Sequence, residues 1–227
     1  DYNSYVRAGR FNPSYGWRLP NHTAYTRRDL GFGENRQVFG LEAGINPNYL
    51  YANLAGFAQG IEGWPGDDEP AGFGSTFNVG WRDLGWQVGA SFHYLNRTEE
   101  GNENDDITGG LTWGVNFYPV VYLGEVDARI TAVPDGDNVV SLFAYHEINA
   151  LVARGFTLKG GYEWQDQNIE TQDDHNHRIF LGTDWHPYTY THIEALYRRT
   201  WTGGSYPLTD LTDAQADELL AILHVWF

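Results

Sequence analysis

The residue types that could carry out covalent chemistry are sparse in this sequence. The chain has six serines, no cysteine and no G-x-S-x-G motif. Ser91 with His93, and Asp184 with His186, could each form a dyad, but residues two apart on one strand more often just share a face. The run 173–177 contains an H-x-H with two carboxylates, which could bind a metal adventitiously, but a chance arrangement at a loop tip is the favoured interpretation. The sequence therefore predicts no catalytic site, no metal site and no cofactor, and hence a protein that is not an enzyme.

Acidic residues form the clearest charged runs. They lie at 67–69, 99–106 and 210–218, and the formal net charge of the chain is −16. Carboxylates suit Ca²⁺ or Mg²⁺, yet no run follows the D-x-[DN]-x-[DN]-G register of a calcium loop. A solvated acidic surface is the favoured interpretation. The acidic balance also argues against nucleic acid as a partner.

Alternation of apolar and polar residues dominates the rest of the chain. In 156–167, Leu158 and Trp164 fall on one face, whereas Lys159 and Glu163 fall on the other. This period of two predicts β-strands that each have one apolar and one polar face. The pattern predicts about twelve strands, near 4–11, 36–46, 48–60, 74–83, 86–98, 107–118, 120–133, 139–153, 156–167, 177–187, 190–201 and 219–227.

The connections between these strands alternate between short and long. Short ones are expected at 46–47, 83–85, 119, 154–155 and 186–188, and long ones at 12–35, 61–73, 99–106, 134–138, 168–176 and 202–218. A transmembrane barrel sorts its loops in this way, because tight turns face the periplasm and longer loops face outward. The sequence thus predicts an all-β fold: a transmembrane antiparallel up-and-down β-barrel of about 12 strands, with both termini periplasmic. We expect residues 1–227 to form this single domain.

The polar strand faces would line the lumen of such a barrel. Charges of both signs recur on these faces, and aromatic residues gather at strand ends, as they do at membrane interfaces. The predicted pore-lining residues are Arg7, Glu42, Arg82, Arg97, Glu125, Asp127, Arg129, Glu147, Lys159, Glu163, Arg178, Asp184, Glu194 and Arg198.

The first long connection, 12–35, is basic. It contains Arg18, Arg27 and Arg28. Folded into the lumen, it would form a constriction loop whose guanidinium groups attract anions. As an ordinary outer loop, it would instead place these arginines beside nearby acids or lipopolysaccharide phosphates. The sequence leaves both interpretations open.

The C-terminal segment LAILHVWF resembles the last strand of bacterial outer-membrane β-barrels, which typically end on Phe with a hydrophobic residue two positions earlier. Here these residues are Phe227 and Val225. The resemblance implies that the barrel-assembly machinery reads this strand, and that the strand pairs with the first one to close the sheet. In addition, GRFNPSYG at 9–16 is similar to the start of phosphate-selective and related anion porins.

These features together predict a porin-like passive channel for small hydrophilic solutes in the bacterial outer membrane. Because the lumen charges are roughly balanced, the basic loop is expected to give a mild preference for anions. Outer-membrane lipid, lipopolysaccharide and the assembly machinery are the expected partners. The alternative is a non-conducting barrel that acts as a scaffold or sleeve for a partner protein such as a secreted factor or a cytochrome, since side chains and one loop can block an interior of this size.

Overall fold

The computed structural model describes residues 3–17, 23–33, 36–61, 70–99, 102–134, 136–203 and 216–226. Strands make up most of this part of the chain. The elements are β1 (Tyr5–Phe11), α1 (Tyr25–Arg28), β2 (Val38–Ile45), β3 (Leu50–Gln59), β4 (Gly72–Arg82), β5 (Trp86–Glu99), β6 (Asn102–Phe117), β7 (Val120–Ala132), β8 (Val139–Ala153), β9 (Phe156–Asp166), β10 (Asn176–Trp185), β11 (Thr191–Thr202) and β12 (Ala216–Val225). Within the described part of the chain, no helix has the length and apolarity needed to span a membrane.

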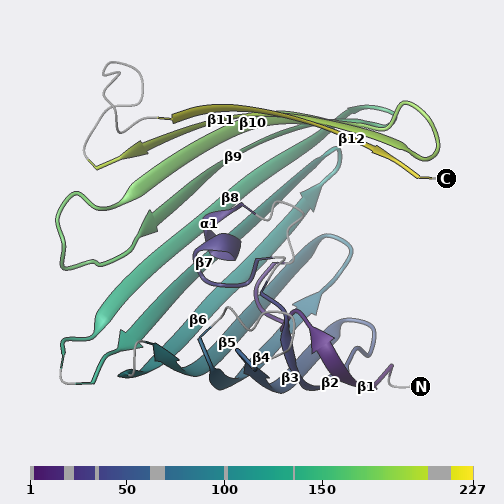
Figure 1. Ribbon diagram of the computed structural model, residues 1–227. Coiled ribbons are helices and arrows are strands. Elements are labelled where there is room, and N and C mark those ends of the chain that lie inside the picture. The colour runs from purple at the N-terminus through teal and green to yellow at the C-terminus, as the bar shows by residue number, and fades with distance from the viewer. Residues whose placement is uncertain are drawn as a thin grey trace.

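All twelve strands belong to one sheet, in which each strand pairs with the next along the chain from β1 to β12. The pairs are antiparallel, so the chain runs up and down around the sheet (Figure 1). This arrangement confirms the predicted all-β, up-and-down class and the predicted number of strands. Because the number of strands is even, β1 begins and β12 ends at the same end of the sheet, which is also the end that carries the short turns (Figure 1).

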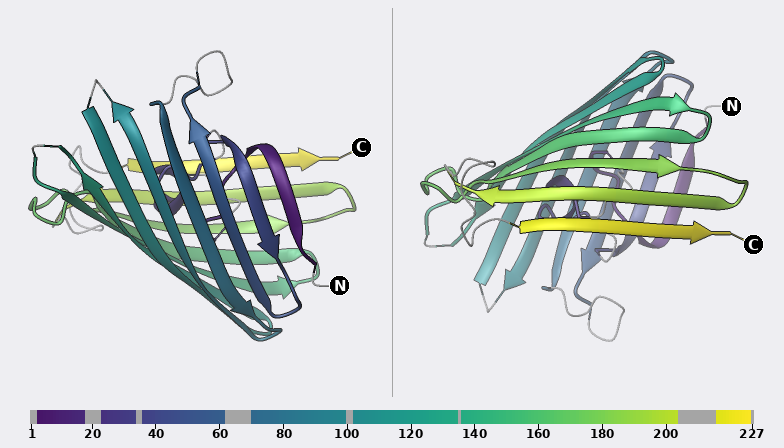
Figure 2. Two further views of the ribbon diagram at one scale, coloured as in Figure 1. Left: turned by 90° about the horizontal axis from the view of Figure 1, so that it is seen from below. Right: turned by 90° about the horizontal axis from the view of Figure 1, so that it is seen from above.

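The sheet curls into a deep trough, and α1 lies inside its concave face (Figures 1 and 2). The expected pairing of the first strand with the last is wrong for this structure, because β1 and β12 form the two margins of the sheet and do not pair. The physical reason is curvature: twelve strands at this curvature turn through only part of a circle (Figure 2). In a bilayer, the unpaired backbone groups along both margins would each cost several kcal/mol, so these margins require cover there.

The two faces of the sheet differ in the way expected of a membrane protein. The convex face exposes large apolar side chains, such as Leu111 with 56% and Leu181 with 65% of its surface accessible. The concave face buries charged ones, such as Glu42 and Glu163, both 0% accessible. Such an inverted arrangement is stable only where an apolar phase surrounds the convex face.

Aromatic side chains mark the short-turn end of the convex face. Trp81, Trp86 and Trp185 are all exposed there, and Tyr49 stacks on Trp81 with ring centroids 5.6 Å apart. Aromatic rings of this kind are favoured at the level of the lipid headgroups. The predicted clustering of aromatic residues at strand ends is therefore present at this end.

One predicted loop is wrong. Residues 99–106 were expected to form a long acidic loop, whereas β5 and β6 stay paired until Glu99 opposes Asn102. The acids are held by the opposite strand: Asp105 accepts hydrogen bonds from Tyr94 (2.8 Å) and from Asn96 (3.0 Å). Their charge therefore does not prevent strand formation.

The other acidic runs are only partly described. Of the run 210–218, Asp217 and Glu218 belong to β12, where Glu218 forms a 3.1 Å ion pair with Arg198. Residues 210–215 of that run, the run 67–69 and the C-terminal Phe227 lie outside the described residues.

Candidate functional site

Loop one is the connection between β1 and β2 at residues 12–37. Its described residues, 12–17, 23–33 and 36–37, run along the concave face instead of away from the sheet (Figure 1). Its first part is tied to strands from different parts of the sheet. The Ser14 hydroxyl donates to Glu42 on β2 (2.8 Å), and the Tyr15 hydroxyl donates to Asp127 on β7 (2.8 Å). Loop one therefore lies inside the trough, in the position that the constriction-loop interpretation requires.

Gly16 allows the closest approach between loop one and the sheet. Its backbone has a φ of +53°, and a Cβ at this position would lie 1.8 Å from a Glu125 carboxylate oxygen. The Gly16 N–H donates to the Ser91 hydroxyl (2.9 Å), and the Trp17 N–H donates to Glu125 (3.2 Å). Any larger residue at position 16 would both strain the backbone and push loop one away from β7.

The second part of loop one is tied to the opposite side of the trough. The Tyr25 N–H, at the start of α1, donates to Glu163 on β9 (2.9 Å). Arg178 on β10 donates to the Thr23 carbonyl (2.9 Å), pairs with Glu163 (3.2 Å), and lies 4.1 Å from the centre of the Tyr25 ring. These contacts join a buried ion pair, a backbone donor and an aromatic ring, so they hold α1 against β9 and β10.

Buried aromatic rings complete the attachment of loop one. Tyr15 stacks on Phe32 with ring centroids 4.1 Å apart, and Phe32 meets His93 of β5 edge-on at 5.0 Å. Burial raises the pKa of the Tyr15 phenol, and the charge of Asp127 raises that pKa further. The phenol therefore stays protonated and can only donate to the Asp127 carboxylate.

All fourteen predicted pore-lining residues occupy positions on the concave face. Seven are basic and seven are acidic. Ion pairs across neighbouring strands join many of them: Arg7 with Glu42 (2.9 Å), Arg97 with Asp106 (2.9 Å), Arg178 with Glu163 (3.2 Å), Lys159 with both Asp184 (3.2 Å) and Glu194, and Arg198 with Glu218 (3.1 Å). The sheet therefore carries little net charge on this face.

Three other predicted residues form hydrogen bonds with uncharged groups. Arg129 donates to the Asp29 carbonyl (2.9 Å), and Arg82 donates to Asn46 (2.5 Å) at the short-turn end. Glu147 accepts hydrogen bonds from Tyr145 and Asn149 of its own strand.

The three arginines of the predicted constriction loop have different environments. Arg27 is buried, and its guanidinium lies 3.4 Å from the Tyr15 carbonyl. Arg28 is exposed and forms a two-point pair with Asp29 (2.6 and 3.1 Å). Arg18 lies outside the described residues. Of the two described arginines, only Arg28 presents its charge to open space.

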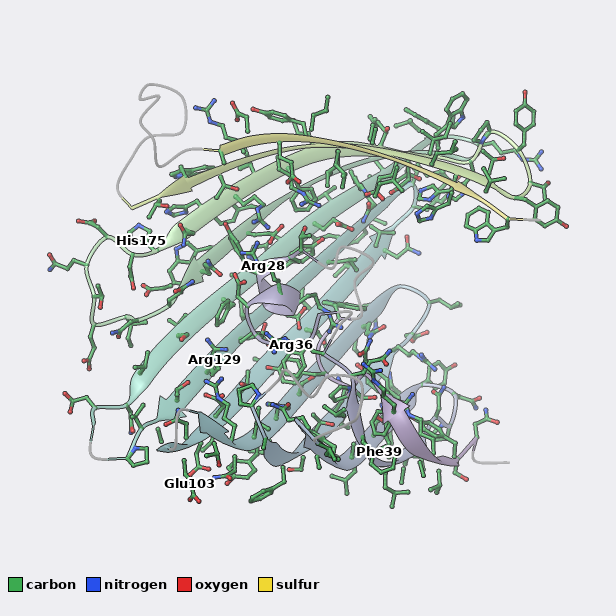
Figure 3. All side chains as sticks on the ribbon, viewed as in Figure 1. Arg28, Arg36, Phe39, Glu103, Arg129 and His175 are labelled. Atoms are coloured by element: carbon green, nitrogen blue, oxygen red, sulfur yellow. The ribbon has the colours of Figure 1, made fainter. Side chains whose placement is uncertain are left out.

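Two cavities lie on either side of loop one. The outer cavity, on the long-loop side, has a volume of about 170 Å³, and its charged lining residues are Arg28, Arg36, Arg97, Arg129, Asp29 and Asp106. Figure 3 shows Arg28, Arg36 and Arg129 within the trough, close to α1. Among the described lining residues, four arginines and two aspartates carry a formal charge of +2.

The inner cavity, on the short-turn side, has a volume of about 400 Å³. Its polar lining residues include Asn53, Asn78 and Gln87, and its only charged lining residue among those described is Arg82. Both cavities beside loop one therefore have a net positive lining, although the whole chain is strongly acidic.

Several residues that hold this site together were not predicted. Ser14, Tyr15 and Tyr25 attach loop one to the sheet, whereas the sequence pattern pointed only to its arginines. A usable signal was present, because loop one contains several aromatic residues that a solvated outer loop has no reason to carry. Ser91 and His93 do share the concave face, but Ser91 bonds Gly16 and Asn78, not His93.

Comparison with known proteins identifies the fold. No family model and no curated protein matches the sequence. Solved structures do match: an outer-membrane-expressed OmpT of Vibrio cholerae has a TM-score of 0.70 at 11% identity, over 89% of this chain and 68% of that chain. An in-vitro folded form of that outer-membrane protein has a TM-score of 0.72 at 11% identity, over 99% of this chain and 77% of that one. An anion-selective porin from Comamonas acidovorans has a TM-score of 0.76 at 14% identity, over 99% of this chain and 75% of the porin.

The chain therefore has the fold of the bacterial outer-membrane β-barrels, as predicted. These neighbours support a location in the bacterial outer membrane. Each neighbour is longer than the part of it that this chain matches. This difference in length is consistent with a twelve-stranded sheet that does not close into a barrel at this curvature. At 11–14% identity, the likeness extends to the fold alone.

The attachment of loop one gives a testable expectation. Glu163→Ala removes the acceptor of the Tyr25 N–H and leaves the buried Arg178 without its carboxylate. Breaking a buried pair costs about 3–5 kcal/mol, so amide hydrogen exchange in 23–33 is expected to accelerate by about 100-fold or more. Exchange followed by mass spectrometry measures this change.

The matched control is Glu147→Ala, which removes a carboxylate of the same face whose hydrogen bonds go to its own strand. Exchange in 23–33 is expected to stay at the wild-type rate in this variant. Equal rates in wild type and Glu163→Ala would show that Glu163 does not hold loop one.

Proposed function

We propose that the chain is a passive outer-membrane channel for small hydrophilic solutes, with a mild preference for anions. The observation that carries this proposal is the charge of the two cavities beside loop one. The outer cavity has four arginines against two aspartates, and the inner cavity has Arg82 and no carboxylate among its described lining residues. The charges nearest the narrowest part of a pore set its selectivity.

The net charge of −16 does not oppose this preference. Among the described acids, Glu103 and Asp217 lie at the long-loop ends of β6 and β12. At physiological salt, charges more than about 8–10 Å from an ion are largely screened. The ion pairs of the concave face also cancel much of the charge within the trough, so the arginines that line the outer cavity contribute strongly to the field beside loop one.

A second candidate function has its own support. Loop one buries Tyr15, Ala24 and Tyr25 almost completely, so side chains fill much of the space between β5 and β10. A trough filled in this way also suits a non-conducting scaffold or sleeve for a partner protein. In that case solutes would not pass, and the cavities would be closed pockets.

Solute uptake by proteoliposomes separates the two functions. Vesicles containing the purified chain are placed in isotonic arabinose and, as a size control, in isotonic stachyose. The channel predicts swelling in arabinose at a rate proportional to protein content and little swelling in stachyose. Absence of swelling in either sugar, with protein that shows the β-sheet circular dichroism of the folded chain, would favour the scaffold instead.

A further inference from the structure

A compact group of metal-binding residue types lies on the concave face at the short-turn end of β10 and β11. Asp184, His192 and Glu194 each offer one ligand atom, and these atoms all lie within 4.8 Å of one another. Asp184 and Glu194 are direct cross-strand partners, and the His192 Nε2 atom lies 2.9 Å from an Asp184 oxygen. None of the three lines the two cavities beside loop one, so this group is separate from the proposed channel site.

Two further imidazoles lie beside this group. His186 stacks on His192 with ring centroids 4.6 Å apart, and the His224 ring lies 5.5 Å from the same ring. His192 and His224 are cross-strand partners on β11 and β12. The strands thus bring three histidines and two carboxylates to one end of the sheet, from positions that are up to forty residues apart in the chain.

A lysine ammonium provides the positive charge beside the two carboxylates of this group. The Lys159 Nζ atom lies 3.2 Å from Asp184 and also contacts Glu194. Two carboxylates and one ammonium leave a formal charge of −1 when the histidines are neutral. The side chains of His192 and Asp184 keep 16% and 27% of their surface accessible, so an ion from solution can reach them.

We propose that Asp184, His192 and Glu194 bind a divalent transition-metal cation of the Zn²⁺ type, which competes with Lys159 for the two carboxylates. Imidazole nitrogen combined with carboxylate oxygen suits such ions, whereas Ca²⁺ and Mg²⁺ prefer ligands that are all oxygen. With metal–ligand bonds of about 2.0–2.2 Å, two ligand atoms of one ion lie at most about 4.4 Å apart. The three ligand atoms lie within 4.8 Å of one another, so small side-chain rotations would bring them to bonding distance of a single ion. His224 or His186 supplies a fourth ligand.

The competing explanation is an ordinary ion-pair network that Lys159 completes. The two explanations differ in the effect of removing this lysine. If a metal ion and the ammonium compete for the same carboxylates, Lys159→Met strengthens metal binding. If the carboxylates exist only to pair with the lysine, the same substitution creates no site.

The experiment is isothermal titration of ZnCl₂ into the purified, refolded full chain after removal of metals with a chelator. The wild type is expected to bind one Zn²⁺ that CaCl₂ does not displace. His192→Ala is expected to weaken this binding by at least about tenfold, and Lys159→Met to tighten it by a similar factor. His146→Ala is the matched control, because it removes one histidine on β8 whose ring contacts Tyr122 and Trp113, and it is expected to leave the affinity unchanged.

Three outcomes would overturn the proposal. The first is a wild type that binds no Zn²⁺. The second is equal stoichiometry and affinity in the wild type and in His192→Ala, which would place any bound ion elsewhere. The third is a Lys159→Met variant that binds Zn²⁺ no more tightly than the wild type. Circular dichroism of each variant confirms that the chain compared is folded.

Discussion

Replacing both Arg28 and Arg36 with glutamate is expected to convert the channel from anion preference to cation preference. The described lining of the outer cavity would then contain two arginines and four carboxylates, so its formal charge changes from +2 to −2. A unit charge about 7 Å from an ion in water contributes about 0.6 kcal/mol, which is nearly threefold in the local concentration of that ion. Four units of charge should therefore change the chloride-to-potassium permeability ratio by more than about tenfold at low salt.

Reversal potentials under a KCl gradient measure this change. The matched control is Arg10→Glu combined with Arg154→Glu, which changes the net charge of the chain equally at two residues that line neither cavity. The control is expected to keep the wild-type reversal potential. If the Arg28 and Arg36 double variant also keeps the wild-type reversal potential, the acidic connections, and not the outer cavity, determine the ion selectivity.

Substituting Leu111 with arginine is expected to destabilise the folded chain in a bilayer by about 2–4 kcal/mol. Leu111 lies near the middle of β6, and 56% of its surface is exposed on the convex face. A charge placed there would face the hydrocarbon region. Urea titration of the chain folded into vesicles measures the loss of stability through a shift in the unfolding midpoint.

Leu84→Arg is the control for this substitution. Leu84 is 93% exposed, but it lies in the short turn between β4 and β5, where water is available. The expected cost there is close to zero. Equal costs at Leu84 and Leu111 would mean that the convex face does not contact lipid.

The number of strands and their orientation could be predicted because both follow from local alternation. Leu158 is exposed and Glu163 is buried, as the period of two in β9 predicts. The β5–β6 hairpin was predicted less well, because its charged residues at 102–106 have the composition of a loop. Their strand conformation depends on partners such as Tyr94 and Asn96 across the sheet.

The course of loop one could not be predicted in the same way. Tyr15 bonds Asp127, and Tyr25 bonds Glu163, across separations of 112 and 138 residues. No local pattern encodes such pairs. The length and basicity of the loop were compatible with a position inside or outside the barrel, and only the three-dimensional arrangement of β7 and β9 distinguishes them.

The sequence pattern also could not predict whether the sheet closes. The expected pairing of the two end strands rested on the resemblance of the C-terminal segment to other terminal strands. Whether β1 and β12 meet depends on the twist and tilt summed over all twelve strands, and alternation carries no information on either quantity.

Current recordings from single molecules of the purified chain in a planar bilayer test the central claim most directly. A passive channel with loop one inside it predicts discrete, ohmic current steps in KCl. Under a KCl gradient, the sign of the reversal potential is expected to indicate a preference for chloride over potassium. Glu163→Ala is expected to give noisier steps, because it weakens the attachment of α1 to β9 and β10. A folded, membrane-inserted chain that passes no current would contradict the claim.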